Sequence, residues 1–274
     1  MSEYVINIIL AVVWFLVIGG ALGIALALAA KFMKVKEDPR IKEITDNLPQ
    51  ANCGGCGYAG CAAFATAVAN GEAKPSKCAV ASKETIAKIS SIIGIETDIQ
   101  VRMRAQVMCS GTRDHAKLKY DYEGIQDCIS AVRLAGGNKL CPNGCMGFGS
   151  CVEACKFDAI KIINGTAAVD YTKCQACGAC VSACPKGLIS LIPFEAKYWV
   201  GCKCTEKGAS TKSWCDVGCI GCKICEKNCE SGAIKVENNL ARIDYSVCNS
   251  CGKCFEVCPR HIIWSSEVHL AVNN

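Results

Sequence analysis

A cysteine pattern that occurs twice constrains this chain more than any other feature of its sequence. In each copy three cysteines stand three positions apart, and a fourth follows four positions later with proline directly after it. The first copy holds Cys174, Cys177, Cys180 and Cys184, and the second holds Cys248, Cys251, Cys254 and Cys258. Runs of this kind hold [4Fe–4S] clusters, with three thiolates on one cluster and the fourth on its neighbour. Because each run has a partner run upstream, we expect four clusters in two similar modules.

Disulfides and zinc are the two other interpretations of so many cysteines. The chain has 25 cysteines in 274 residues, a share typical of disulfide-rich secreted scaffolds. Cysteines this close together on tight loops suit a metal cluster better than a disulfide. Structural zinc sites use four tetrahedral ligands, often in separated Cys-x2-Cys pairs, and runs that end in Cys-Pro do not follow that pattern. Iron–sulfur clusters are therefore favoured, and their thiolates indicate a reducing, cytoplasmic environment.

Charge and motifs exclude several other functions. The net charge is only +5, and no block of lysine and arginine suited to nucleic acid occurs. The sequence contains neither a G-x-G-x-x-G motif after a strand nor a P-loop, so we expect no nucleotide site. We also find no nucleophile with a neighbouring base. The sequence therefore predicts electron transfer, with no catalytic residue and no complete active site in this chain.

The N-terminal segment Val5–Ala30 contains no charged residue and is long enough to cross a membrane. A cleaved secretory signal would be shorter and would start with basic residues, whereas Glu3 precedes this segment. The basic residues that follow it are Lys31, Lys34, Lys36, Arg40 and Lys42. Because none precedes it, the positive-inside rule places the C-terminal side in the cytoplasm. We expect a single-pass anchor in the inner or plasma membrane, with the iron–sulfur domains on the cytoplasmic side.

Three glycines lie along this segment, at Gly19, Gly20 and Gly23. Small residues let a neighbouring helix approach closely. A lipid-facing helix that happens to contain glycines is an equally good interpretation.

A separate cassette follows the anchor. Asp38-Pro39 predicts the start of a short helix that ends near Leu48. Four cysteines then follow with the spacing Cys-x2-Cys-x4-Cys-x16-Cys, namely Cys53, Cys56, Cys61 and Cys78. Cys61 is expected to open an alanine-rich helix through about Ala69, whose N-terminus would stabilise the negative charge of a cluster. We expect these four cysteines to bind their own [4Fe–4S] cluster, with a structural zinc site as the alternative.

The two modules repeat with an offset of 74 residues. Between the cysteine runs each copy predicts a β-hairpin, with its turn at Asn164-Gly165 or at Asn238-Asn239. The second module has a complete set of ligands for two clusters. We assign one cluster to Cys219, Cys222, Cys225 and Cys258, and the other to Cys229, Cys248, Cys251 and Cys254.

The first module departs from this pattern at one position. The offset places Phe148 where the second module has Cys222, and we infer that Cys141 supplies the missing ligand. The sets are then Cys141, Cys145, Cys151 and Cys184 for one cluster, and Cys155, Cys174, Cys177 and Cys180 for the other. Without Cys141 the first of these sites would have three thiolates, and it would hold a three-iron cluster or a labile fourth iron.

Five cysteines remain outside these sets. Cys109 and Cys202 each follow a short apolar, strand-like stretch, and the offset of 74 relates Cys128 to Cys202. We hypothesise a sixth cluster between the modules, bound by Cys109, Cys128, Cys202 and Cys215. Buried free thiols are the alternative. Cys204 stays without an assignment.

Together these observations predict an α+β protein. It would have a single N-terminal transmembrane helix, a small helical iron–sulfur domain and two tandem bacterial-ferredoxin-like 2[4Fe–4S] modules, with five clusters or six. The expected boundaries are 1–36 for the anchor and its basic segment, 37–100 for the first cassette, 101–140 for a connecting region with Cys109 and Cys128, 141–190 for the first module, 191–214 for a connecting region with Cys202, and 215–274 for the second module.

Four motifs are unusual for simple ferredoxins. They are N-C-G-G-C-G-Y-A-G-C at Asn52–Cys61, Tyr122–Ile125 followed by Asp127-Cys128, the C-x3-C-x5-C-x3-C run at Cys141–Cys155, and G-C-I-G-C at Gly218–Cys222. With the N-terminal segment they resemble the B subunits of Rnf complexes, which are membrane ferredoxin:NAD oxidoreductases that pump Na⁺ or H⁺. The resemblance covers nearly the whole chain. It implies a relay that takes electrons from reduced soluble ferredoxin and passes them to other subunits of the membrane complex, which carry flavins, further iron–sulfur centres and the NAD site.

Two other functions stay open from the sequence. One is a self-standing, membrane-tethered polyferredoxin that serves other reductases. The other is an activator or sensor, because the first cassette also resembles one in corrinoid iron–sulfur proteins. Lys253 and Arg260 are candidates for docking an acidic ferredoxin, although a solvated surface is the favoured interpretation. Ion pumping is not expected within this chain, because a single anchor without intramembrane charge offers no ion path.

Overall fold

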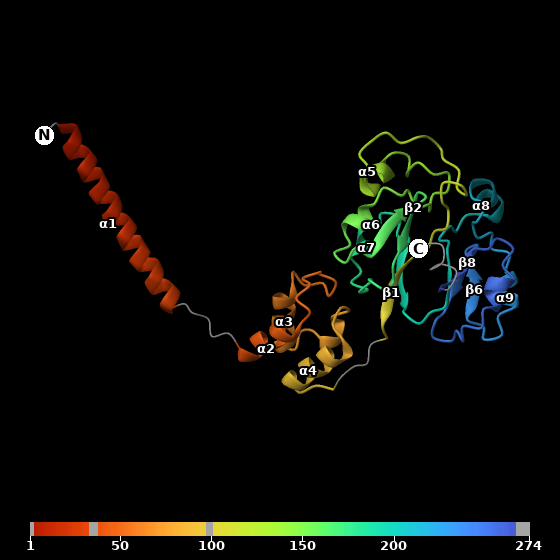
Figure 1. The fold of residues 1–274 in the computed structure, drawn as a ribbon, viewed down its shortest axis with the longest axis horizontal. Helices are drawn as coiled ribbons and strands as arrows, with labels where there is room; N and C mark the ends of the chain where they lie inside the picture. Colours follow the sequence, from red (N-terminus) through yellow and green to blue (C-terminus); the bar gives the residue numbers. More distant parts are fainter. Residues whose placement is uncertain (1–2, 33–37, 97–100, 267–274) are drawn as a thin grey trace.

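The computed structural model describes residues 3–32, 38–96 and 101–266. The chain forms a long helix, a small helical domain and two ferredoxin-like modules, coloured in chain order in Figure 1. Helix α1 (Glu3–Phe32) contains a stretch, Ile6–Ala29, that is long and apolar enough to cross a membrane. Its large apolar side chains are exposed along its length. Of the basic residues predicted to follow the helix, Lys34 and Lys36 lie outside the described residues.

Three α-helices and one 3-10 turn form the small helical domain. The helices are α2 (Pro39–Asn47), α3 (Cys61–Ala69) and α4 (Lys83–Ile93), and the turn is η1 (Pro75–Lys77). The helix starts predicted at Asp38-Pro39 and at Cys61 are both confirmed, and the Asp38 carboxylate caps α2 by accepting the Arg40 N–H at 2.9 Å. The core consists chiefly of Ile44, Leu48, Phe64, Val68 and Ile89. Burying each of these side chains contributes roughly 1.5–3 kcal/mol.

Each module contains the β-hairpin that the sequence predicts. Strand β2 (Ile160–Ile163) pairs with β3 (Thr166–Val169), and β6 (Ile234–Glu237) pairs with β7 (Leu240–Ile243), both antiparallel. Asn164 and Gly165 have φ values of 46° and 73°, and Asn238 and Asn239 have 48° and 61°. Positive φ at both central positions is the geometry of a type I′ turn, which asparagine and glycine tolerate well. Both hairpin predictions are therefore confirmed.

A second pair of strands closes each module across a long stretch of sequence. Strand β1 (Met103–Val107) pairs antiparallel with β4 (Ile189–Pro193), and β5 (Tyr198–Val200) pairs antiparallel with β8 (Ile263–Ser265). Cys109 and Cys202 therefore each follow a strand by two residues, as the apolar stretches before them suggested. The two regions expected to be connectors each contribute a strand to a module. The exact domain boundaries stay predictions.

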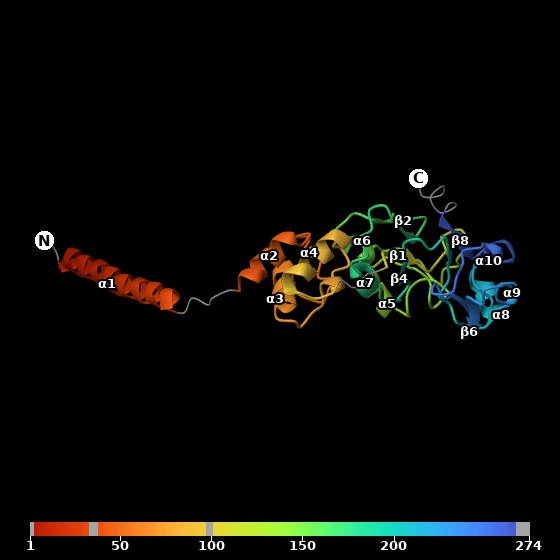
Figure 2. The ribbon, with the colours of Figure 1, turned by 90° about the horizontal axis from the view of Figure 1, so that it is seen from below.

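Short helices complete the two modules. They are α5 (Cys128–Arg133), α6 (Ser150–Glu153) and α7 (Ala179–Ala183) in the first, and α8 (Gly208–Trp214), α9 (Ile224–Lys227) and α10 (Lys253–Glu256) in the second. Figure 2 shows the helical domain, the first module and the second module in a row. In both modules buried cysteines share the core with aliphatic side chains, so the thiols occupy interior positions that an ordinary protein would fill with hydrocarbon.

Gly221 packs against the hairpin turn of the second module. Its φ is +65°, and an added Cβ would lie 2.9 Å from the Cα of Asn239. We expect Gly221→Ala to destabilise the loaded protein by about 1–3 kcal/mol, because left-handed strain and a backbone clash add. The matched control is Gly232→Ala, which has a φ of +66° but nothing within 4 Å of the added Cβ. The measurement is the half-time of cluster loss on heating under anaerobic conditions. Equal half-times for the two variants would contradict the expectation.

Candidate metal centres

The four cysteines of the first cassette line one cavity. Cys53, Cys56, Cys61 and Cys78 surround a volume of about 330 Å³. The side-chain carbonyl of Asn52 accepts the N–H of Cys61 at 2.8 Å, which fixes the cysteine loop against the first turn of α3. Cys61 is the first residue of α3, and helix N-termini favour negative charge. The structure thus brings together the four cysteines that the sequence grouped.

The second module holds two sets of four thiols. The inner set, Cys219, Cys222, Cys225 and Cys258, lines a cavity of about 350 Å³. The outer set is Cys229, Cys248, Cys251 and Cys254. Burial, together with like-charge repulsion from the other three thiols of its set, raises the pKa of Cys254 to about 11. Both sets are those grouped from the sequence.

The first module has an outer set of the same kind. Burial, and to a smaller extent the neighbouring Cys174, Cys177 and Cys155, raise the pKa of the Cys180 thiol to about 12. These four cysteines were grouped from the sequence, and the structure places them in one another's electrostatic reach.

The inner site of the first module contains a different cysteine from the one expected. Its cavity, of about 360 Å³, is lined by Cys128, Cys145, Cys151 and Cys184. Burial, together with the neighbouring Cys145, Cys128 and Cys184, raises the pKa of Cys151 to about 12. Cys141 lines another cavity. The expected grouping of Cys141 with Cys145, Cys151 and Cys184 is therefore not the grouping that the structure shows.

Helix α5 explains why Cys128 reaches this cavity. The Asp127 carboxylate caps the helix by accepting the N–H groups of Ile129 and Ser130. The N–H of Cys128 donates to the Ser150 hydroxyl at 2.8 Å. Ser150 directly precedes Cys151 on α6, so this bond holds the start of α5 beside the inner site.

Phe148, which stands where the second module has a cysteine of its inner set, serves packing instead. Its ring stacks at a tilt on the ring of Tyr122, with 5.1 Å between the centroids. Tyr122 belongs to the stretch that leads into α5. The aromatic pair therefore helps to hold the segment that delivers Cys128.

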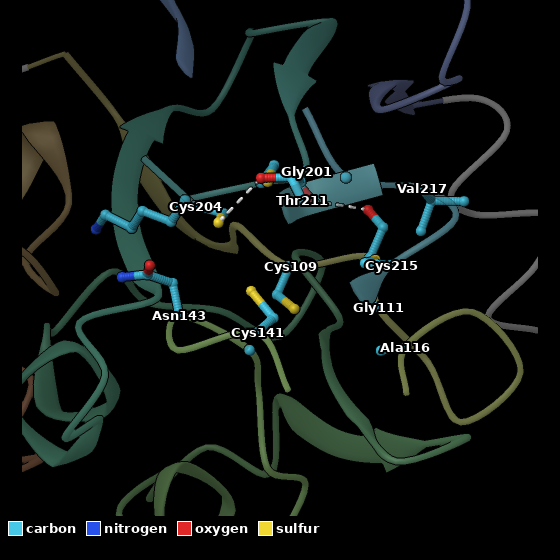
Figure 3. A pocket seen from close by; sticks show the side chains of 15 residues that line it. Cys109, Gly111, Ala116, Cys141, Asn143, Gly201, Cys204, Thr211, Cys215 and Val217 are labelled. Carbon is cyan, nitrogen blue, oxygen red and sulfur yellow. Dashed lines mark hydrogen bonds between the residues drawn. The ribbon is translucent and has the colours of Figure 1, made fainter. Parts of the chain in front are cut away.

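Five thiols line a further cavity between the two modules. They are Cys109, Cys141, Cys202, Cys204 and Cys215, around a volume of about 360 Å³. Figure 3 shows Cys109, Cys141, Cys204 and Cys215 gathered about this space. Three cysteines of the hypothesised sixth set are present here, whereas Cys128 lies in the inner site of the first module.

The first cassette touches the first module at a cysteine loop. Cys177 of the module lines the cavity of the cassette. At Gly55 the two backbones approach so closely that an added Cβ would clash with the carbonyl oxygen of Cys177. The Lys156 ammonium donates to the Asn52 carbonyl oxygen at 2.7 Å across the same contact. The site of the cassette and the outer site of the first module are thus direct neighbours.

The donor sets fit cubane clusters. A [4Fe–4S] cluster takes one thiolate on each iron, so its ligands stand apart around a cavity. Across residues 3–32, 38–96 and 101–266, no three His, Cys, Asp or Glu side chains converge closely enough to hold a single metal ion. Backbone N–H groups also point at sulfur, with Ala105 donating to Cys174 and Leu188 to Cys184, both at 3.4 Å. Such donors stabilise charge on a ligand sulfur and tune the potential of its cluster.

A buried cation that sequence reasoning missed lies beside these sites. Arg104 in β1 is 1% exposed. Its partners are the side chain of Gln106, the carbonyl oxygen of Ala196 and the rings of Tyr171 and Trp199. Burial lowers the pKa of its guanidinium, which still keeps its charge. The part of the chain that the structure describes gives it no carboxylate partner. The signal that could have found it is a charged residue inside an apolar strand.

Arg104 is adjacent to a cysteine of the outer site in the first module. The next residue, Ala105, donates its N–H to the Cys174 sulfur. The charge of Arg104 also acts on Tyr245, which in turn lies within electrostatic reach of Cys248 and Cys254 in the second module. A positive charge is therefore buried between the outer sites of the two modules.

Sites of four thiols, present in a separate cassette and repeated across two ferredoxin-type modules, define an iron–sulfur electron-transfer protein. Family models match in the same places. A model for an Fe-S cluster segment matches residues 48–80, a 4Fe-4S binding domain matches 167–190, and a 4Fe-4S dicluster domain matches 218–263.

Similar proteins narrow this class to a family. The B subunit of an ion-translocating oxidoreductase complex from Methanosarcina acetivorans is 39% identical over 264 residues, which cover 96% of this chain and 99% of the relative. Its counterpart in a Na⁺-translocating complex from Acetobacterium woodii is 42% identical, over 90% of this chain and 74% of the relative. The counterpart in a proton-translocating complex from Clostridium ljungdahlii is 41% identical, over 92% and 90%. The chain belongs to the family of B subunits of ion-translocating oxidoreductase complexes and is thus a member of a multi-subunit complex.

Gly55→Ala should separate the first cassette from the first module. The added Cβ would clash with the Cys177 carbonyl, whereas Gly57→Ala, at a φ of +84° with nothing within 4 Å, strains the same loop without that clash and is the comparison variant. We expect full iron content in both variants, faster hydrogen exchange around Cys177 in Gly55→Ala, and slower electron transfer between cassette and module. Electron transfer slows because tunnelling falls steeply with distance. Unchanged exchange and transfer in Gly55→Ala would show that the contact is not made in solution.

Arg104→Met should lower the reduction potential of the outer cluster in the first module. A buried positive charge stabilises the more negative, reduced state, so its removal disfavours reduction by roughly tens of millivolts at an effective dielectric constant of about 20. Arg104→Lys keeps the charge and is the matched control. The measurement is a redox titration followed by EPR. A potential that moves equally in both variants would point to packing and not to charge.

Proposed function

We propose that the chain is the iron–sulfur relay of a membrane-bound, ion-translocating ferredoxin:NAD oxidoreductase. It takes electrons from reduced soluble ferredoxin and passes them to partner subunits. The observation that carries this proposal is the series of four-thiol sites in the second module, the first module and the cassette, with direct contact between cassette and first module at Gly55 and Cys177. The relatives in A. woodii and C. ljungdahlii are named as subunits of ferredoxin:NAD⁺ oxidoreductases, which supports the donor and acceptor.

Five [4Fe–4S] clusters are proposed for the cassette and the two modules. The sets that keep the sequence grouping are Cys53, Cys56, Cys61 and Cys78; Cys155, Cys174, Cys177 and Cys180; Cys219, Cys222, Cys225 and Cys258; and Cys229, Cys248, Cys251 and Cys254. The fifth set is Cys128, Cys145, Cys151 and Cys184, as its shared cavity supports. When bound, such clusters accept and release single electrons.

The residues of the chain determine how those electrons are held. Aliphatic side chains and buried cysteines cover much of each inner site, which lowers the effective dielectric around the buried thiols. Backbone N–H donors and the buried Arg104 stabilise negative charge at the outer site of the first module. The protein thus sets the order of potentials by burial, hydrogen bonds to sulfur and one fixed charge.

Helix α1 is proposed to anchor the chain as a single span in the inner or plasma membrane. Its length and apolar surface support a span, and the basic residues after it support a cytoplasmic location for the iron–sulfur domains. The anchor would keep the cassette close to the polytopic subunits of the complex.

The two basic residues considered for ferredoxin docking already have partners in the chain. Lys253 forms an ion pair with Glu230 at 2.6 Å. Arg260 donates to the carbonyl oxygens of Cys215 and Gly218. Arg260 therefore holds a loop of the inter-module cavity, and ferredoxin docking is not assigned to either residue.

Gentle detergent purification under anaerobic conditions tests the relay function. We expect the chain to co-purify with polytopic membrane subunits and a flavin subunit. A reduced 2[4Fe–4S] ferredoxin should bleach the visible absorbance of its clusters. NADH should not bleach the clusters of the isolated chain, because the sequence has no nucleotide motif. A chain that purifies alone and passes electrons to unrelated reductases would favour the stand-alone polyferredoxin and overturn the proposal.

A further inference from the structure

We propose that the cavity between the two modules holds a sixth [4Fe–4S] cluster, bound by Cys109, Cys141, Cys202 and Cys215. The inference rests on the proposed relay function, to which it adds a carrier between the modules. Relative to the set expected from the sequence, Cys141 replaces Cys128, because the structure places these two cysteines in different cavities.

Backbone hydrogen bonds show that Cys109 and Cys202 occupy equivalent positions. The N–H of Met108 donates to the carbonyl oxygen of Leu188 at 2.8 Å. In the second module the N–H of Gly201 donates to the carbonyl oxygen of Ile262 at 2.7 Å. Leu188 and Ile262 are related by the offset of 74, so the residues that follow Met108 and Gly201 correspond.

Hydrogen bonds to sulfur repeat the same equivalence. The N–H of Cys145 donates to the Cys109 sulfur at 3.3 Å, and the N–H of Cys219 donates to the Cys202 sulfur at 3.5 Å. The donors Cys145 and Cys219 are again related by the offset of 74. Bonds from backbone N–H groups to sulfur also occur at Cys174 and at other cysteines of the cluster sites.

Each module therefore supplies one matched pair of thiols to the shared cavity. Cys141 and Cys215 correspond because they are 74 residues apart. Cys109 and Cys202 correspond because each follows an equivalent strand by two residues. A cubane presents four equivalent iron vertices, so two pairs from two related modules suit its symmetry.

The size of the cavity supports the same ligand class. Its volume of about 360 Å³ compares with about 330, 350 and 360 Å³ for the cavities of the cassette, the second module and the first module. Each of those three cavities is lined by a complete set of four thiols. A space of equal size with at least four thiols on its walls is therefore suited to the same cluster.

Two cations lie close to the thiols of this cavity. Lys139 is 3% exposed, and its ammonium donates to the carbonyl oxygen of Gly111, which also lines the cavity. The Arg260 guanidinium donates to the carbonyl oxygen of Cys215 at 2.7 Å. Buried negative charge needs nearby compensation, and these two groups supply it.

Cys204 is the fifth thiol, and it lies two residues after Cys202. The equivalent position, two residues after Cys109, is Gly111, so Cys204 has no counterpart in the first module. Its sulfur lies 3.5 Å from the Thr211 hydroxyl, whose own hydrogen goes to the carbonyl oxygen of Glu206 at 3.4 Å. This contact with Thr211 and the absence of a counterpart set Cys204 apart from the two matched pairs of thiols.

This site would connect the two modules. Cys109 accepts a hydrogen bond from Cys145, which lines the inner site of the first module. Cys202 accepts one from Cys219, which lines the inner site of the second. A cluster here would stand between the two inner sites, each one hydrogen bond away.

Iron and acid-labile sulfide per chain test the proposal on full-length, anaerobically purified protein. We expect about 24 of each in the wild type, four for each of six clusters. Cys109→Ser, Cys141→Ser, Cys202→Ser and Cys215→Ser should each fall to about 20, with a loss of one cluster. Cys204→Ser is the matched control and should keep the wild-type content.

Double variants show which cysteines share a cluster. Two ligands of one cluster remove the same four irons, so Cys109→Ser with Cys141→Ser should stay at about 20. Cys109→Ser with Cys128→Ser should fall to about 16, because two clusters are lost. The iron contents of the variants are compared with one another. A general loss of stability would lower the iron content of all variants, and it would be visible in their circular dichroism spectra.

Four results would overturn the inference. Loss of iron in Cys204→Ser but not in Cys202→Ser would assign the site to other thiols. About 16 irons in Cys109→Ser with Cys141→Ser would place these residues on different clusters. A wild type with about 20 irons that ferredoxin still reduces would remove the sixth cluster and leave the relay intact. Little iron with bound zinc would remove both the sixth cluster and the relay.

Discussion

Bonds between cysteine sulfur and iron take the place of much of the hydrophobic core in both modules. The strands are only three to five residues long, and buried cysteines lie in the middle of each apolar cluster. Small domains bury little apolar surface, so a metal or a crosslink adds much to their stability. Burial raises the pKa of thiols such as Cys151 and Cys225 to about 12, so an empty site holds neutral thiols and releases protons as it loads. Folding and cluster insertion are therefore one coupled process.

Duplication explains most of the architecture, and the departures from it occur where the two copies meet. Hairpins, closing strand pairs and hydrogen bonds to sulfur recur with the offset of 74. The first copy has Phe148 where the second has Cys222, and a longer segment precedes its cysteine run and brings Cys128 to the inner site through α5. Cys128 lines the inner site, whereas Cys141 lines the cavity shared with the second copy. In the proposed assignment, a single exchange of ligands would complete one site and open another.

Local sequence chemistry was enough to predict the starts of α2 and α3 and both hairpins, and it groups the same cysteines that the structure brings close together in four places. The reason is that each of these features depends on residues close in sequence, or on the two copies of the module, which can be aligned with each other by their constant offset of 74 residues. Three features depend on distant contacts and could not be predicted. The closing strand pair β1–β4 joins residues far apart along the chain, the choice between Cys128 and Cys141 depends on how α5 docks on Ser150, and Arg104 is buried only because the strand pair covers it. Spacing alone treats Cys128 and Cys141 as equal candidates.

The contacts between sites also limit how electrons can move. The cassette meets the rest of the protein at the Cys177 loop, where the absence of a side chain at Gly55 allows backbone contact. Cys177 is grouped with the outer site of the first module, so in the proposed relay an electron passing between the cassette and the modules would cross that site. Arg104 lies beside the same site, and a positive charge there makes reduction easier. Arg104 and the contact at Gly55 thus lie at one place in the fold, so in the proposed relay the outer site of the first module would be the exchange point between the cassette and the two modules.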